Sequence, residues 1–246
     1  MTDLPKCEDK KLGLLIDLDI CVGCHACVVS CKEWNSSGDT KQLSDVNAHQ
    51  KEPVGTFLNH VHSFEKENKE NNESEPFYFP KSCLHCEDAP CVTVCPTGAS
   101  YKRPEDGIVL VNEEDCMGCG LCAWACPYGA RELDLLSGVM KKCTLCVDRI
   151  DDHDLPEEDR VPACVKSCPT GARSFGDFND PNSKVSKIAK ERKGVDLMPE
   201  MKTKPVNKYL LPRIKSNFDK EFNAEENADL NVSGFLSWVD KALDKL

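Results

Sequence analysis

Residues 116–127 read CMGCGLCAWACP, a run in which four cysteines are separated by two, two and three residues and a proline follows the last one. Three thiols at such short spacings lie on one loop, where they can face a common centre. The three residues before the fourth thiol leave room for a first helical turn, and the proline then redirects the chain. The segment therefore predicts a loop that presents three ligands together and carries the fourth elsewhere.

The same arrangement occurs three more times, so that all but one of the 17 cysteines fall into four groups. Groups two, three and four end in Cys-Pro, whereas group one ends in Cys31-Lys32. The groups, in chain order, are Cys21, Cys24, Cys27 and Cys31; Cys83, Cys86, Cys91 and Cys95; Cys116, Cys119, Cys122 and Cys126; and Cys143, Cys146, Cys164 and Cys168.

This repetition indicates 4Fe-4S clusters, four in all, because in two-cluster ferredoxins three cysteines of such a run bind one cluster and the fourth binds the cluster of the other run. Paired CxxC units can also form a closed tetrahedral zinc site, which is the main alternative. Structural disulfides are disfavoured, because the polar start over 1–11 does not resemble a secretory signal. Iron and sulfide analysis with EPR would distinguish clusters from zinc.

The exchange of fourth cysteines requires a choice of which groups pair. Groups two and three are neighbours in the sequence, and groups one and four can close around them, which predicts an inner and an outer pair. A pairing of group one with two and of three with four would contradict this hypothesis. The predicted ligand sets are Cys83, Cys86, Cys91 with Cys126; Cys116, Cys119, Cys122 with Cys95; Cys21, Cys24, Cys27 with Cys168; and Cys143, Cys146, Cys164 with Cys31.

Short apolar runs bracket the groups at 12–16, 108–111 and 173–175, and each predicts a short strand. With the helical turns, they indicate an α+β fold of two ferredoxin-like two-cluster modules, with short hairpins and helices, long loops and a wrapping C-terminal tail. The predicted organisation is an outer module over 1–35 and 138–180, an insertion or linker over 36–80, an inner module over 81–137, and a tail over 181–246.

Two segments without cysteines allow more than one interpretation. Residues 63–76 are dominated by Glu, Lys and Asn; we expect a solvated loop there, and an acidic docking surface is the alternative. Residues 233–246 have apolar side chains at helical spacing. They predict a terminal amphipathic helix that packs on this chain or docks to a partner.

Single residues near the cysteines have predicted roles as well. His25 and His85 lie inside cysteine loops that are already complete, so we expect spacers or hydrogen-bond donors rather than iron ligands. Cys7 is expected to be a spare thiol. Trp124 is expected to pack over its cluster and exclude water, which helps to set a reduction potential.

Composition excludes some functions. The formal net charge of -11 and the lack of a basic segment argue against nucleic-acid binding. No run approaches the roughly 18–20 apolar residues that cross a bilayer, so we expect a soluble, cytoplasmic chain. No set of residues resembles a catalytic triad. The chain alone is therefore expected to carry electrons and not to be an enzyme.

The segments KCTLCVDRI at 142–150 and PACVKSCPTGA at 162–172, with CVGCHACVVSCKEWN at 21–35 and the runs at 83–111 and 116–134, resemble the iron–sulfur subunit of molybdopterin oxidoreductases of the dimethyl sulfoxide reductase family. The resemblance covers about residues 12–213. In some members a tryptophan replaces one cysteine of the third group. Here all four cysteines are present, which implies four cubane clusters.

Three further segments, at 54–65, 175–194 and 197–213, are similar to the iron–sulfur subunits of membrane-bound sulfite dehydrogenases, or sulfite:quinone oxidoreductases. This similarity implies a complex in which a molybdopterin catalytic subunit oxidises sulfite, this chain passes the electrons on, and an integral membrane subunit reduces quinone. It also implies attachment to the inner membrane through that partner. The alternatives are the same role in a dimethyl sulfoxide, polysulfide, thiosulfate or tetrathionate reductase, or a free polyferredoxin.

Overall fold

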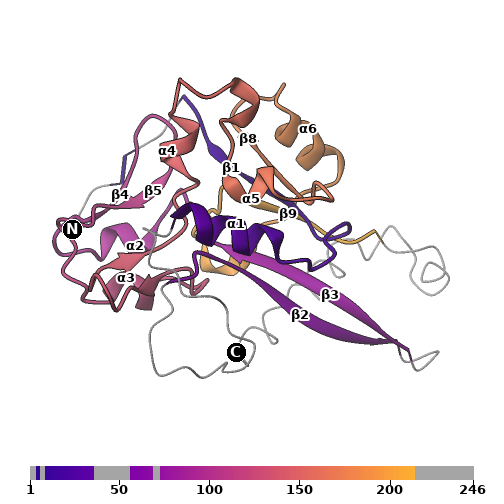
Figure 1. Cartoon of the computed structure of the whole chain (residues 1–246), viewed down its shortest axis with the longest axis horizontal. Helices are drawn as coiled ribbons and strands as arrows, with labels where there is room; N and C mark the ends of the chain where they lie inside the picture. Colours follow the sequence, from indigo (N-terminus) through magenta and orange to yellow (C-terminus); the bar gives the residue numbers. More distant parts are fainter. Residues whose placement is uncertain (1–3, 6–8, 36–55, 69–72, 214–246) are drawn as a thin grey trace.

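The computed structural model describes residues 4–5, 9–35, 56–68 and 73–213 of the chain (Figure 1). It combines short strands with short helices, which confirms the predicted α+β class. The largest sheet within these residues has three strands in the order β8-β1-β9, and the other strands form two-stranded hairpins. No helix in the described part of the chain is long and apolar enough to span a membrane.

The three-stranded sheet joins the two ends of the described chain. Strand β1 (Leu12–Asp17) pairs antiparallel with β8 (Arg173–Asp177) and parallel with β9 (Lys208–Leu210). Both faces of β1 are covered. Leu14 belongs to the main core, while Leu15 packs in a small second cluster with Val185 of α6 (Lys184–Glu191). This two-sided burial explains why the strand reads as one continuous apolar run.

Two small hairpins follow groups two and three. Strands β4 (Ser100–Lys102) and β5 (Val109–Val111) form one, and β6 (Glu132–Leu133) and β7 (Met140–Lys141) form the other. The strands predicted at 12–16, 108–111 and 173–175 correspond to β1, β5 and β8. The β6–β7 hairpin crosses the predicted module boundary between residues 137 and 138, and the division into modules stays a prediction.

Every cysteine group contains a short helix with its third cysteine as the second helical residue, as the spacing predicted. These helices are α1 (Ala26–Asn35), α2 (Pro90–Thr93), α3 (Leu121–Trp124) and α5 (Ala163–Lys166). The three short ones lie in the groups that end in Cys-Pro, and a proline disfavours the helical conformation in the residue before it. Group one has Lys32 in place of the proline, and α1 continues to Asn35.

Further helical turns lie outside these positions. Helix α4 (Val147–Ile150) follows Cys146, and two 3-10 helices, η1 (Glu157–Asp159) and η2 (Pro199–Met201), lie in the connecting segments.

The expectation of a solvated loop over residues 63–76 is wrong. Strands β2 (Asn59–Asn68) and β3 (Glu73–Ser82) pair along their whole length and form the long hairpin that extends from the body of the molecule in Figure 1. The side chains of His60, His62 and Phe64 stack along one face, and Phe64 stacks on Phe77 across the hairpin. Aromatic pairs across strands stabilise such hairpins, and the many Glu, Lys and Asn residues, which are rare in strands, hid this pattern.

The predicted tail is an integral part of the fold up to residue 213. The backbone N–H of Val206 donates to the carbonyl of Leu84, and the Asn207 side chain connects β1 to the loop of group two. Tyr209 stacks on Phe79 with ring centroids 4.9 Å apart. The segment therefore holds the sheet against the second cysteine group. The predicted terminal helix at 233–246 lies outside the described residues.

Asn207 provides a test of this connection. Its side chain is fully buried, its Oδ1 accepts from the backbone N–H of Leu14 at 2.7 Å, and its Nδ2 donates to the carbonyl of Cys83 at 2.9 Å. Asn207→Ala leaves two buried backbone groups unpaired, so we expect it to lower the free energy of unfolding by about 2–5 kcal/mol. Thermal unfolding of the cluster-loaded protein measures the loss, and Asn182→Ala, an exposed change, is the control. Equal stability of the two variants would contradict the prediction.

Candidate iron–sulfur sites

One cavity is lined by cysteines of groups two and three. The four are Cys83, Cys86, Cys91 and Cys126. Burial first, and then nearby thiolates with Cys83 before Cys126, together raise the pKa of the Cys86 thiol to about 12. These sulfurs therefore share a buried space in which four negative charges would repel one another strongly unless a cation binds between them.

A second cavity is lined by the remaining cysteines of the same two groups, Cys95, Cys116, Cys119 and Cys122. Backbone amides already donate to two of these sulfurs. The N–H of Ser100 lies 3.3 Å from Cys95 Sγ, and the N–H of Met140 lies 3.4 Å from Cys116 Sγ. Cys119 is exposed to solvent. The structure thus brings Cys126 to the first three cysteines of group two and Cys95 to those of group three; that these are the ligand sets of the inner pair stays a prediction.

The fourth cysteines of groups one and four also lie near cysteines of the other group. Burial raises the pKa of the Cys31 thiol, and the thiolates of group four, Cys143 first, raise it further. Burial also raises the pKa of Cys21, and the Cys27 and Cys168 thiolates add to the shift. The structure therefore brings Cys31 to group four and Cys168 to group one, and the pairing of these groups as cluster ligands stays a prediction.

The turns between the cysteines require an unusual backbone. Each group has left-handed residues there, namely Gly23 and His25, His85, Gly118 and Gly120, and Leu145 and Cys146. The left-handed conformation costs an L-residue about 1–2 kcal/mol. We therefore expect it only where the loop must bend so that its cysteines face a common point. At Gly118 a side chain is also excluded by space, because a Cβ atom would lie 2.2 Å from the carbonyl oxygen of Gly138.

His85 lies between two of the cysteine sets. It is fully buried, and its Nδ1 accepts from the backbone N–H of Val109 at 3.1 Å, which leaves the ring proton on Nε2. Burial lowers the pKa of the imidazole, but the thiolates around it, Cys83 first and Cys143 also, outweigh this and raise it. The predicted role of spacer and hydrogen-bond donor fits this position, which joins the set of Cys83 to the set of Cys143.

Buried cations surround the cysteine sets. Lys142, Arg131 and Arg173 have exposed fractions of 3–6%, and none of them forms an ion pair with a carboxylate among the described residues. The guanidinium atoms Arg131 Nη1 and Arg173 Nε have no hydrogen-bond partner there either. A buried cation without an anionic partner is costly. These cations therefore fit anionic groups bound between the thiolates.

The donors around the cysteine sets suit 4Fe-4S clusters. No described group of three or more Cys, His, Asp or Glu side chains lies close enough to hold one metal ion. The 16 described cysteines are also all free of disulfides. Thiolate donors, amide N–H donors to sulfur and compensating cations together fit 4Fe-4S clusters. Cys7 lies outside the described residues.

Asn35 is a site residue that the sequence analysis missed. Its Nδ2 lies 3.6 Å from Cys31 Sγ and 3.8 Å from Cys146 Sγ, so one amide reaches sulfurs of two groups. Its Oδ1 is 3.5 Å from the Thr144 hydroxyl, which donates to it. The sequence did contain an indication of this role. Group one lacks the proline that ends the other helices, so Asn35 lies one helical turn after Cys31 on the same face.

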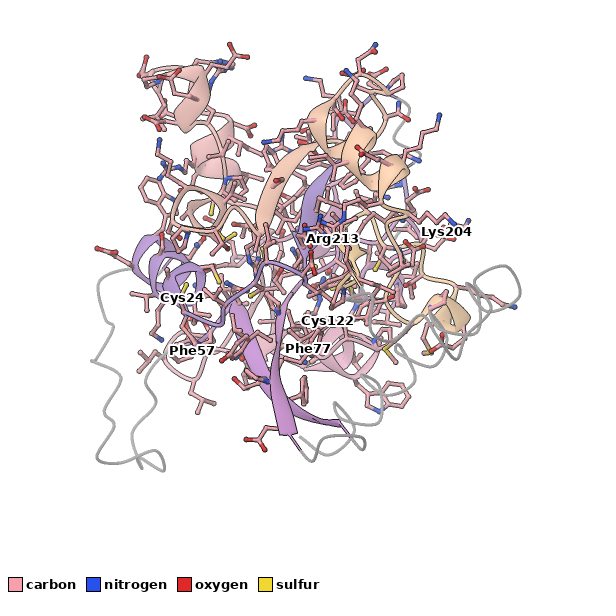
Figure 2. All side chains as sticks on the ribbon, turned by 90° about the vertical axis from the view of Figure 1, so that its right-hand side faces the viewer. Cys24, Phe57, Phe77, Cys122, Lys204 and Arg213 are labelled. Carbon is pink, nitrogen blue, oxygen red and sulfur yellow. The ribbon has the colours of Figure 1, made fainter. Side chains whose placement is uncertain are left out.

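The expectation for Trp124 is wrong. Its side chain is 87% exposed and does not cover a cluster site. Met117 and Leu121 are exposed as well, and both line the second cavity together with Cys119. Helix α3 is a single turn with Cys122 facing inward, so the residue two positions later points away from the core. Figure 2 shows the buried Cys122 and the exposed Cys24 at well separated places in the molecule.

These features define a ferredoxin-like protein of the 4Fe-4S class. Two family models, each described as a 4Fe-4S dicluster domain, match residues 20–99 and 74–178. Two dicluster domains account for four clusters, and the 16 grouped cysteines match that requirement.

The relatives define the family further. The chain is 60% identical over 206 residues to the B subunit of sulfite dehydrogenase from Allochromatium vinosum, a match that covers 84% of this chain and 85% of that protein. It is 38% identical to the B subunit of polysulfide reductase from Wolinella succinogenes, over 80% of this chain and 92% of that one. The B subunit of tetrathionate reductase from Salmonella typhimurium is 36% identical, over 81% of this chain and 72% of that one. The protein belongs to this family of iron–sulfur electron-transfer subunits of oxidoreductase complexes, as its resemblance implied.

The amide of Asn35 allows a test of how the chain tunes one site. A hydrogen bond to sulfur stabilises the reduced, more negative state, and its net contribution of about 0.5–1.5 kcal/mol corresponds to about 20–60 mV for one electron. We therefore expect Asn35→Ala to lower the reduction potential of one cluster by up to about 60 mV and to leave the others unchanged. EPR-monitored redox titration measures each potential. A shift no larger than that of Asn182→Ala would contradict this role.

Proposed function

We propose that this protein binds four 4Fe-4S clusters and carries electrons between a molybdopterin catalytic subunit and a quinone-reactive integral membrane subunit, in a complex that oxidises sulfite. The observation that carries the proposal is the 60% identity over 85% of the B subunit of a sulfite dehydrogenase. The reductase subunits that match are 36–38% identical. The chain supplies no substrate site in this proposal, and it is held at the inner membrane, on the cytoplasmic side, by its membrane partner.

The proposed ligands are the interleaved cysteine sets described above. Each set takes three cysteines from one group and the fourth from its paired group, which makes an inner module over 81–137 and an outer module over 1–35 and 138–180. The sets are Cys21, Cys24, Cys27 and Cys168; Cys31, Cys143, Cys146 and Cys164; Cys83, Cys86, Cys91 and Cys126; and Cys95, Cys116, Cys119 and Cys122.

Contacts between cysteines of different sets support a linear arrangement of the four sets. Along the relay, the sets follow one another in the order in which they are named above. Cys164 lies near Cys27, so the first two sets are neighbours. His85 lies near both Cys83 and Cys143, which makes the second and third sets neighbours. The third and fourth sets share the two groups of the inner module. When bound, the clusters supply reversible one-electron transfer.

Exposure supports the same order. The second set consists of buried cysteines, and the third has three buried cysteines and the partly buried Cys126. The first and fourth sets each contain one exposed cysteine, Cys24 and Cys119. A relay needs access at its two ends and shielding in between, which this distribution provides.

Apolar side chains mark both exposed ends. Val22 and Val29 are 56% and 53% exposed near Cys24. Met117 and Trp124 are exposed near Cys119. Exposed apolar patches on a protein surface are typical of protein interfaces. We propose that one end docks to the catalytic subunit and the other to the membrane subunit.

Purification of the native complex tests the proposed function. A tagged chain is expected to copurify with a molybdopterin protein and a hydrophobic subunit, and sulfite is expected to reduce its clusters as seen by EPR. Reduced complex is then mixed with dimethyl sulfoxide, polysulfide, thiosulfate or tetrathionate in turn. Reoxidation by one of these, without reduction by sulfite, would assign the chain to a reductase. A chain that purifies alone would instead be a free polyferredoxin.

Cysteine variants test the ligands separately from the substrate. Cys122→Ser is expected to remove about a quarter of the iron, to abolish one EPR signal and to interrupt the relay, because a serine oxygen replaces one thiolate of the fourth set. Cys7→Ser, outside all four sets, is the matched control and is expected to keep its iron and its electron transfer. Equal loss of iron in the two variants would show that the ligands are misassigned.

A further inference from the structure

Two of the cysteine groups continue into short sequences that differ at only one position. Group three ends in CPYGAR at 126–131, and group four ends in CPTGAR at 168–173. Group two has CPTGAS at 95–100, which places Ser100 where the other two have arginine. Arg131 and Arg173 are therefore equivalent residues, one in each proposed module, and each follows its cysteine by five positions.

Arg131 is held between two cysteine sets. It is 6% exposed, and its Nη2 donates to the hydroxyl of Ser100 at 2.7 Å. The thiolates that act on it are Cys91 and Cys83 of one set and Cys122 of the other. The Arg131 guanidinium thus lies between the two sets of the inner module. The residue that orients it, Ser100, occupies the equivalent position in group two.

Arg173 has the same relation to the outer module. It is 3% exposed, its Nη2 donates to Asn59 Oδ1 at 2.6 Å, and its Nη1 lies 3.8 Å from Cys164 Sγ. The strongest thiolate influences on it come from Cys164 of one set and Cys27 of the other. Both modules therefore have one buried guanidinium at the junction of their two sets.

The charge of these residues is permanent. The guanidinium of an arginine is not deprotonated in proteins. No carboxylate among the described residues forms an ion pair with either one. A fixed, uncompensated positive charge in a low-dielectric interior stabilises negative charge on either side of it far more than it would in water. Each reduction step adds one negative charge to a cluster.

We propose that Arg131 and Arg173 are potential-setting residues, each raising the reduction potentials of both clusters of its own module and thereby keeping those two potentials close together. The proposal rests on the proposed ligand sets. It assigns one arginine to the first and second sets and the other to the third and fourth. Small steps in potential within a module allow an electron to pass in either direction.

The test is a redox titration of the native complex, monitored by EPR, with chemical reductant and mediators in place of substrate. Arg131→Met is expected to shift the equilibrium for reduction of the two inner-module clusters at least tenfold toward the oxidised state, about 59 mV for each, and to leave the outer two unchanged. Arg173→Met is expected to do the reverse, so each variant is the control for the other. Arg131→Lys and Arg173→Lys keep the charge and are expected to recover most of each shift.

Two milder variants keep the test valid if the Met variants do not assemble. Ser100→Ala and Asn59→Ala release one hydrogen bond of each guanidinium without removing its charge, and a smaller shift is expected in the same two clusters. Unchanged potentials, or an equal shift of all four clusters, would overturn the proposal. The titration uses a chemical reductant and no substrate. Its result therefore does not depend on whether sulfite reduces the complex in the separate test of the proposed function. Loss of iron from the Cys7→Ser control would instead point to wrong ligand sets.

Discussion

The concentration of negative charge in a small interior is the constraint on which the rest of the structure depends. Sixteen free cysteines lie in the described part of the chain, and thiols must be deprotonated to bind iron. The protein balances this charge without using surface lysines. It buries Arg131, Lys142 and Arg173 among the sulfurs, and it directs backbone and side-chain amides at Cys95, Cys116 and Cys31. The core is therefore partly ionic, and its cations and sulfurs depend on each other.

A core of this kind leaves little room for regular secondary structure. Most helices are single turns and most strands have two to six residues, so local hydrogen bonding alone would hold the loops weakly. Long-range contacts compensate. Asn207 connects the first strand to the second cysteine loop, and Tyr209 stacks on Phe79 of the long hairpin. The segment after the last cysteine is thus as important to the fold as the cysteine loops are.

What could be predicted from the sequence followed from the cysteine spacing. It predicted a helical turn in each group and the strands beside them, because short spacings leave the backbone few conformations; the interleaving of the groups stays a prediction. The β2–β3 hairpin was missed because its stabilising pattern, His60, His62 and Phe64 on one face, is hidden among residues that are poor strand formers. The position of the Trp124 side chain was predicted wrongly, because the spacing shows that it is close to the cysteines in the sequence but does not show in which direction it points. Arg131 and Arg173 could have been found, since the same six-residue pattern starts at the last cysteine of both groups.

The difference in exposure between the sets also determines which sets are oxidised first when the chain is separated from its partners. Dioxygen and peroxide attack accessible sulfur first, and the accessible cysteines, Cys24 and Cys119, lie at opposite ends of the proposed relay. Oxidative damage would therefore begin at both ends while the middle sets remain intact. Such a chain would still be brown and rich in iron, yet it would no longer exchange electrons with anything outside itself. Assembly into a complex then preserves function by covering the ends, and iron content alone is a poor measure of an active preparation.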